Sequence, residues 1–291
     1  MSKNYLSIYA KSFNWAGYFL SKETYNDCSS LYDFCRTVDD IADNEDGLEH
    51  KKVELHKFKK KFYEKDFSSK KIESMWGLID KFSISTKVIG DLFDGVETDL
   101  KDNVNIANRR ELLIYSYRVA GTVGLMMAKV LKVNSREALK SAINLGIAMQ
   151  LTNIARDVVE DRKKNRKYIE HNFKEIKETV AYAEKFYNSS FNSIKMIPIL
   201  NRFAILVARR VYREIGNKII KKKNLNEYDR SGKIFVTKFG KIIQTIFSVI
   251  DFFILLFVKT ENQSENEEYS IINETINFCL LYTSDAADDD H

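Results

Sequence analysis

The sequence predicts an all-α protein, and its composition gives the first reasons. The chain of 291 residues contains a single proline, Pro198, and only 11 glycines, whereas average usage would supply about 15 prolines. Sandwiches, barrels and propellers need frequent turns, and glycine and proline make most of those turns. Hydrophobic residues make up 44% of the chain, which is enough for a large buried core and excludes a mostly disordered protein.

The helical spacing of apolar residues is the second reason, and it begins at residues 31–42. This first helix is expected to end before the acidic loop 43–46 and Gly47. The next stretch, 51–65, is strongly charged, which is typical of a solvent-exposed helix.

The same spacing predicts further helices along the rest of the chain. Polar segments at 102–108 and 133–135 separate the first three of them, and the expected bounds are 84–100, 110–131, 136–159, 179–187, 199–220 and 233–258. No repeat, flexible linker or change of composition interrupts residues 1–260, so we expect a single domain there. Residues 261–278 are expected to form a polar tail. Residues 279–291 resemble a translated sequencing adapter and are expected to be foreign to the natural chain.

The segment 242–258 is the most apolar part of the sequence. It is shorter than the ~20 residues that a membrane-spanning helix needs. One stripe along it is polar and consists of Lys241, Gln244, Thr245, Ser248 and Asp251. We expect a buried terminal helix. The alternative is a helix that lies in a membrane interface and attaches the protein to the cytoplasmic face of the membrane.

Cysteines and charge bear on location and partners. Cys28, Cys35 and Cys279 form an odd set without metal-ligand spacing, which favours a reducing cytoplasm. Residues 1–23 lack the uninterrupted apolar core of a signal peptide, so we expect the protein to stay in the cytoplasm. The formal charge of +5 is spread among acidic residues and gives no reason to expect a nucleic-acid partner.

Two of the predicted helices carry acidic residues along one face. Asp39 and Asp43 are four residues apart and therefore lie on the same face of helix 31–42. The later helix carries a stripe about 80° wide, which consists of Gln150, Asn153, Asp157 and Asp161. Like charges at this spacing destabilise an isolated helix by a few tenths of a kcal/mol, so each pair favours a bound cation.

Oxygen ligands without histidine or cysteine favour Mg²⁺ or Ca²⁺ over zinc. Mg²⁺ usually takes one or two carboxylates and completes its shell with water and substrate phosphate, so a diphosphate substrate is expected. Arg36 and Arg156 stand next to the acidic residues in the sequence and could bind phosphate oxygens.

Other interpretations of the acidic residues are weaker. An EF-hand loop with Gly47 at its sixth position would place Ala42 and Val53 at its first and last ligand positions, which excludes it. A di-iron bundle needs Glu-x-x-His pairs, and no histidine of the chain belongs to one. Either pair alone would be taken for a solvent-exposed helix face, but the two together favour a metal site.

The acidic residues belong to longer motifs that follow one another between residues 11 and 241. These are Ser12-Phe13, Tyr32-Asp33-Phe34-Cys35-Arg36 before the first acidic pair, Asp94-Gly95 with Asp99, and the stretches 115–124, 150–161, 208–212 and 233–241. In this order they resemble the squalene/phytoene synthase family, the head-to-head prenyl synthases of the isoprenoid synthase fold.

The resemblance implies a helical cavity with two diphosphate sites and with Mg²⁺, or Mn²⁺ in its place. The implied metal ligands are Asp39, Asp43, Asn153, Asp157 and Asp161. The implied diphosphate contacts are Ser12, Arg36, Gln150, Arg156 and Lys233, the last at a position where the family usually has arginine. Tyr32, Tyr115 and Tyr212 match positions near the reacting carbons. The implied helix break along the cavity includes Val119, Ala120, Gly121, Val123 and Gly124.

The implied reaction joins two allylic diphosphates. One loses diphosphate and alkylates the second to a cyclopropylcarbinyl diphosphate, which ionises and rearranges. Residues 150–158 resemble bacterial phytoene synthases most, which implies geranylgeranyl diphosphate as substrate, proton loss instead of NADPH reduction, and a desaturase as the next enzyme of carotenoid synthesis. The alternatives are a C15 synthase of squalene, dehydrosqualene or hydroxysqualene, and a non-catalytic relative that acts as an assembly factor.

Overall fold

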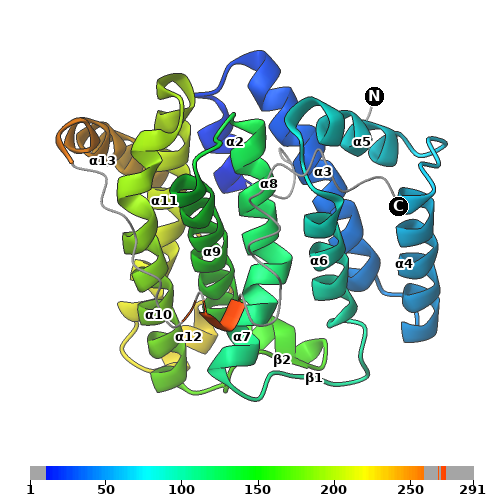
Figure 1. Ribbon diagram of the computed structural model, residues 1–291. Helices are drawn as coiled ribbons and strands as arrows, with labels where there is room; N and C mark the ends of the chain where they lie inside the picture. The colour runs from blue at the N-terminus through cyan, green and yellow to red at the C-terminus, as the bar shows by residue number, and fades with distance from the viewer. Residues whose placement is uncertain (1–10, 259–267, 269, 273–291) are drawn as a thin grey trace.

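The computed structural model describes residues 11–258, 268 and 270–272, with side chains from residue 14 onward. Its long helices stand side by side in one bundle (Figure 1). The bounds of the α-helices, short ones included, are α2 Lys11–Gly17, α3 Lys22–Asp43, α4 Leu48–Tyr63, α5 Lys70–Phe82, α6 Thr86–Glu97, α7 Arg109–Ser116, α8 Thr122–Val130, α9 Arg136–Lys163, α10 Phe173–Phe191, α11 Ile199–Ile220, α12 Leu225–Arg230 and α13 Lys238–Phe257.

The prediction of an all-α fold is confirmed. Within the described residues the only strands are β1 (Val104–Asn105) and β2 (Arg166–Lys167), which pair in parallel. Helix 199–220 has the predicted bounds, and helix 136–159 extends to Lys163. The sequence analysis missed α2 and α12, because helices of 7 and 6 residues show too few turns of periodicity to be recognised. It also missed the 13 residues of α5. The calls on residues 279–291 lie outside the described residues.

The predicted helix 110–131 is interrupted at its centre. A π-helical turn, η1 (Tyr117–Gly121), joins α7 to α8. Gly124 and Gly146 allow this region to touch α9, because a Cβ on Gly146 would lie 2.2 Å from the carbonyl oxygen of Ala120 and one on Gly124 would lie 2.3 Å from that of Ala142. Only glycine permits backbones to approach so closely.

Helix α9 forms the centre of the bundle. It packs against α8, α10, α11 and η1, and most of its first 20 residues are buried on all sides, as expected of a helix that neighbours surround. Ser135 caps its start by accepting a hydrogen bond from the backbone N–H of Ala138 at 3.2 Å. The polar residues Gln150 to Asp161 occupy the later part of this helix, where exposure increases toward Glu160.

Helix α13 packs on the outside of α11 (Figure 1). It is the one helix of the described residues that is long and apolar enough to cross a membrane, and 17% of its most apolar window is buried. The expectation of a buried terminal helix is therefore wrong: the polar stripe faces the protein and most apolar side chains point outward.

Candidate active site

A cavity of about 690 Å³ lies inside the bundle. The structure brings nearly all of the predicted site residues to its wall: Tyr32, Arg36, Asp39, Asp43, Tyr115, Val119, Ala120, Val123, Gly124, Gln150, Asn153, Arg156, Asp157, Asp161, Tyr212 and Lys233. Ser12 lies in α2 at a position whose side chain is not among the described ones. Gly121 does not line the cavity, because it faces the Tyr117 ring and Ile143 in the core.

The character of the wall changes along α9. Between residues 138 and 149 its lining side chains are mostly small or apolar, and between 150 and 161 they are mostly polar or acidic. Apolar residues from η2 (Asn192–Met196) and the segments around it add to the first part, among them Ile194, Ile197 and Ile205. The cavity therefore has an apolar end and a charged end.

Three carboxylates of α3 surround Arg36 at the charged end. The guanidinium lies 2.6 Å from Asp39, 2.6 Å from Asp40 and 3.9 Å from Asp43. Asp39 lines the cavity, and 43% of its side chain is exposed. Its removal from bulk water and the nearby Asp43 raise the pKa of Asp39 to about 6, against the influence of Arg36.

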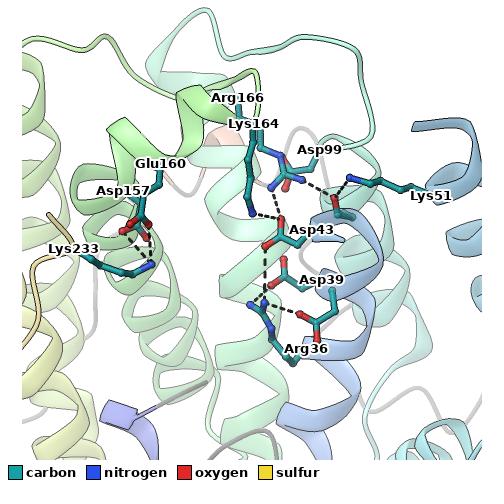
Figure 2. A network of polar contacts seen from close by, with 12 residues as sticks. Arg36, Asp39, Asp43, Lys51, Asp99, Asp157, Glu160, Lys164, Arg166 and Lys233 are labelled. Carbon is teal, nitrogen blue, oxygen red and sulfur yellow. Dashed lines mark hydrogen bonds and ion pairs between the residues drawn. The ribbon is translucent and has the colours of Figure 1, made fainter. Parts of the chain in front are cut away.

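Arg166 reaches the same cluster from β2. It donates to Asp43 at 2.5 Å and to the carbonyl oxygen of Ala42 at 3.0 Å (Figure 2). Burial would raise the pKa of Asp43, but Arg166 and Lys164 outweigh it and hold the pKa below its usual value. The turn after α9 places Arg166 here: Asn165 adopts a left-handed φ of 57°, which asparagine tolerates better than most residues, and β2 then pairs with β1.

Two tyrosines bind the buried carboxylate of Asp99 beside this cluster. The hydroxyl of Tyr168 donates to it at 2.6 Å and that of Tyr115 at 2.9 Å, and the two rings stack with centroids 4.7 Å apart. Burial raises the pKa of Asp99 even though Arg166 is close. This network holds the Tyr115 ring rigidly in the cavity wall.

The second charged cluster consists of α9 residues and of Lys233 from the segment between α12 and α13, and it faces the first across the cavity (Figure 2). Arg156 binds Asp157 with two hydrogen bonds, at 2.7 and 2.5 Å. Lys233 lies 3.0 Å from Glu160 and 3.6 Å from Asp157. Burial, together with the charge of Asp157, raises the pKa of Asp161 to about 7.

The oxygen atoms that could act as metal ligands in this cavity fit Mg²⁺. The Asn153 Oδ1 atom is buried without a hydrogen-bond partner in the cavity wall, and such an orphaned acceptor is costly unless something binds it. No three carboxylate, imidazole or thiol groups of the described residues converge on one point. Mg²⁺ does not require that, because it takes one or two carboxylates and fills its shell with water and phosphate.

The sequence analysis missed Arg166, Lys164 and Tyr168, and did not place Asp99 in the site. The signal for the first two was the basic run 162–167 directly after the second acidic motif. Such a run is usually a solvated helix end, and only the β1–β2 pairing turns Arg166 toward α3. Tyr168 gave no signal of its own.

Comparisons with known proteins agree with this geometry. A family model described as squalene/phytoene synthase matches residues 7–173. The chain is 27% identical over 247 residues to 15-cis-phytoene synthase of Pantoea ananas, covering 74% of this chain and 80% of that protein. Presqualene diphosphate synthase of Sinorhizobium fredii is 30% identical over 141 residues, covering 48% of this chain and 50% of that protein. The crystal structure of a dehydrosqualene synthase in complex with ligand matches with a TM-score of 0.70 at 26% identity, over 84% of this chain and 93% of that one.

Proposed function

The chain belongs to the squalene/phytoene synthase family, and from this premise we propose that it condenses two molecules of geranylgeranyl diphosphate head to head to phytoene. The observation that carries the proposal is the pair of acidic helices, α3 and α9, on one cavity whose other end is apolar. The two charged clusters at one end of the cavity suit two diphosphates, and the apolar end suits two hydrocarbon chains.

We propose that Mg²⁺, or Mn²⁺ in its place, is held by Asp39 and Asp43 on α3 and by Asn153, Asp157 and Asp161 on α9. When bound, the metal would supply positive charge that stabilises the diphosphate leaving group. The orphaned Oδ1 of Asn153 supports this assignment.

The cations of the site would bind the diphosphate oxygens. Arg36 and Arg156 each hold carboxylates of their own helix, and a phosphate offers the same kind of acceptor for a guanidinium. Lys233 stands at the cavity wall with 54% of its side chain exposed, so it can follow a ligand. Ser12 and Gln150 complete the proposed set.

The aromatic and apolar wall would protect the cationic intermediates. Tyr32 and Tyr212 line the cavity, and burial raises the pKa of both phenols. Their neutral rings would present electron-rich faces to a cation. Val119, Ala120 and Val123 line the same space and would exclude water, which would otherwise quench a carbocation. Phytoene then forms by proton loss, without NADPH.

The decisive experiment incubates the purified full chain and Mg²⁺ with farnesyl or geranylgeranyl diphosphate and identifies the hydrocarbon by mass spectrometry. We expect a C40 product without NADPH and none from Asp157→Asn. The second candidate is a C15 synthase, which the likeness to a dehydrosqualene synthase favours. A C30 product with no C40 product would establish that candidate.

A non-catalytic assembly factor is the third candidate, and cells distinguish it from an enzyme. If Asp157→Asn restored the function of a deletion strain as well as the unaltered chain, the enzymatic proposal would fail. For the active enzyme we also propose a cytoplasmic location and a desaturase as the consumer of its product.

A further inference from the structure

The outward side of α13 forms the largest run of exposed apolar side chains on any described helix. Each of its members is at least 43% exposed, and the set, called here the α13 face, is Phe239, Ile242, Ile246, Phe247, Val249, Ile250, Phe253, Ile254, Leu256 and Phe257. The only acidic residue of the helix, Asp251, is 4% exposed. A contiguous apolar surface of this kind marks an interaction site.

The polarity of α13 is the reverse of that of a surface helix in a soluble protein. Its polar side chains point inward: Asp251 accepts two hydrogen bonds from Arg210, at 2.5 and 2.6 Å, and Thr245 accepts one from the Trp15 indole at 3.0 Å. These contacts hold the helix along its middle against the protein. Because these bonds fix the polar side of α13 to the protein, the α13 face on the opposite side of the helix points outward.

Two further exposed apolar side chains follow η2, which is bonded to the end of α13. Lys195 donates to the carbonyl oxygen of Val258 at 2.9 Å, which joins η2 to this end of the helix. The neighbouring Ile199 and Leu200 are 57% and 81% exposed.

Positive charge stands at both ends of the α13 face. Lys238 begins the helix and is exposed, and Lys195 lies at its other end. Within the part of the chain that the structure describes, neither lysine forms an ion pair with a carboxylate, and Lys195 donates to a carbonyl oxygen instead. The chain as a whole carries a formal charge of +5. An apolar face between basic side chains complements a bilayer with anionic headgroups.

We propose that the α13 face docks onto an anionic lipid bilayer, with α13 lying in the plane of the interface. The Arg210–Asp251 pair and the Trp15–Thr245 bond keep one side of the helix on the protein, so the helix lies along the membrane instead of crossing it. Residues of the apolar cavity end, Ile194 among them, pack directly against Leu255 on the inner side of α13. The inference does not depend on the proposed reaction.

Flotation of the full chain with vesicles, without substrate, tests this proposal. We expect binding to vesicles of 70% phosphatidylcholine and 30% phosphatidylglycerol, and at least tenfold weaker partition for the double variant Ile246→Glu/Phe253→Glu. The matched control is Val53→Glu/Phe67→Glu, which changes two other exposed apolar residues by the same charge and should bind like the unaltered chain. Failure of the unaltered chain to bind, or equal binding by the α13 variant, would overturn the proposal.

A second measurement covers the case in which the double variant does not fold. Ile250→Trp places an indole on the α13 face. The fluorescence that this indole adds is the difference between the emission of the variant and that of the unaltered chain. Vesicles of brominated phosphatidylcholine with phosphatidylglycerol should quench it. Light scattering of the unaltered chain tests the competing occupant. If the unaltered chain is a dimer, if Ile246→Glu/Phe253→Glu is a monomer, and if the vesicles do not quench the indole of Ile250→Trp, the α13 face binds a second copy of the chain instead of a bilayer.

Discussion

Replacing Arg166 by methionine tests whether this residue joins the two acidic helices, as its contacts indicate. The Arg166 side chain is 9% exposed and binds an Asp43 side chain that is 23% exposed. Removing one partner of a buried ion pair costs about 3–5 kcal/mol. Asp43 keeps Lys164 at 3.3 Å and is partly solvated, so we expect Arg166→Met to lose about 2–3 kcal/mol of unfolding free energy.

Urea unfolding at pH 7 measures this loss, with Lys164→Met as control. Lys164 binds the same carboxylate but is 47% exposed, so its removal should cost under about 1 kcal/mol. Because Arg166 lowers the pKa of Asp43, its stabilisation is present above the unfolded pKa and is lost as the pH falls through the lowered pKa. The difference in unfolding free energy between the unaltered chain and Arg166→Met should therefore become smaller toward pH 3. A loss no larger than that of the control would refute the reasoning.

Activity gives a second readout of the same variant. Partners that orient metal ligands typically contribute about 10–100-fold to metal affinity or activity, and Arg166 contacts both Asp43 and the carbonyl oxygen of Ala42. We expect Arg166→Met to lower turnover by about 10–100-fold at saturating Mg²⁺. Unchanged turnover would show that Asp43 needs no such support.

Three further predictions concern packing, metal and pH. Gly146→Ala should lower the unfolding free energy by about 1–3 kcal/mol, because its Cβ would lie 2.2 Å from the Ala120 oxygen. Gly77→Ala, with nothing within 4 Å of its Cβ, should raise that free energy in the same urea titration. Asn153→Leu should raise the unfolding free energy measured without Mg²⁺ by about 1 kcal/mol, since it removes a buried acceptor that has no partner, while activity falls at least about tenfold. Calorimetry should show Mg²⁺ binding more tightly as the pH rises from 5.5 to 7.5, because the raised pKa values of Asp39, about 6, and Asp161, about 7, require proton release. Identical Mg²⁺ affinity at both pH values would contradict this expectation.

Local patterns predicted most of the helices and the faces of the two acidic ones. Helical periodicity depends on residues three and four positions apart, so the side of α3 that carries Asp39 and Asp43 could be assigned without a fold. The prediction that α9 presents Gln150, Asn153, Asp157 and Asp161 together had the same basis, and the structure places all four on the cavity wall.

Long-range contacts decided the rest, and α13 is the clearest case. The sequence showed that its polar residues form one stripe, but a stripe does not say which side faces water. Partners from distant parts of the chain, Arg210 and Trp15, turn the stripe inward. Gly121 differs from its neighbours for a similar reason, because the π-helical turn directs it toward Ile143 and away from the cavity.

The sequence by itself therefore determined the all-α class and the two acidic helix faces. The tertiary structure alone decided that Arg166 crosses from β2 to Asp43, that Tyr168 and Tyr115 share Asp99, and that α13 is apolar on its outer side. The physical reason is the distance along the sequence over which each property is set. Periodicity and ligand type are properties of neighbouring residues, whereas pairing between segments depends on the free energy of packing the whole chain.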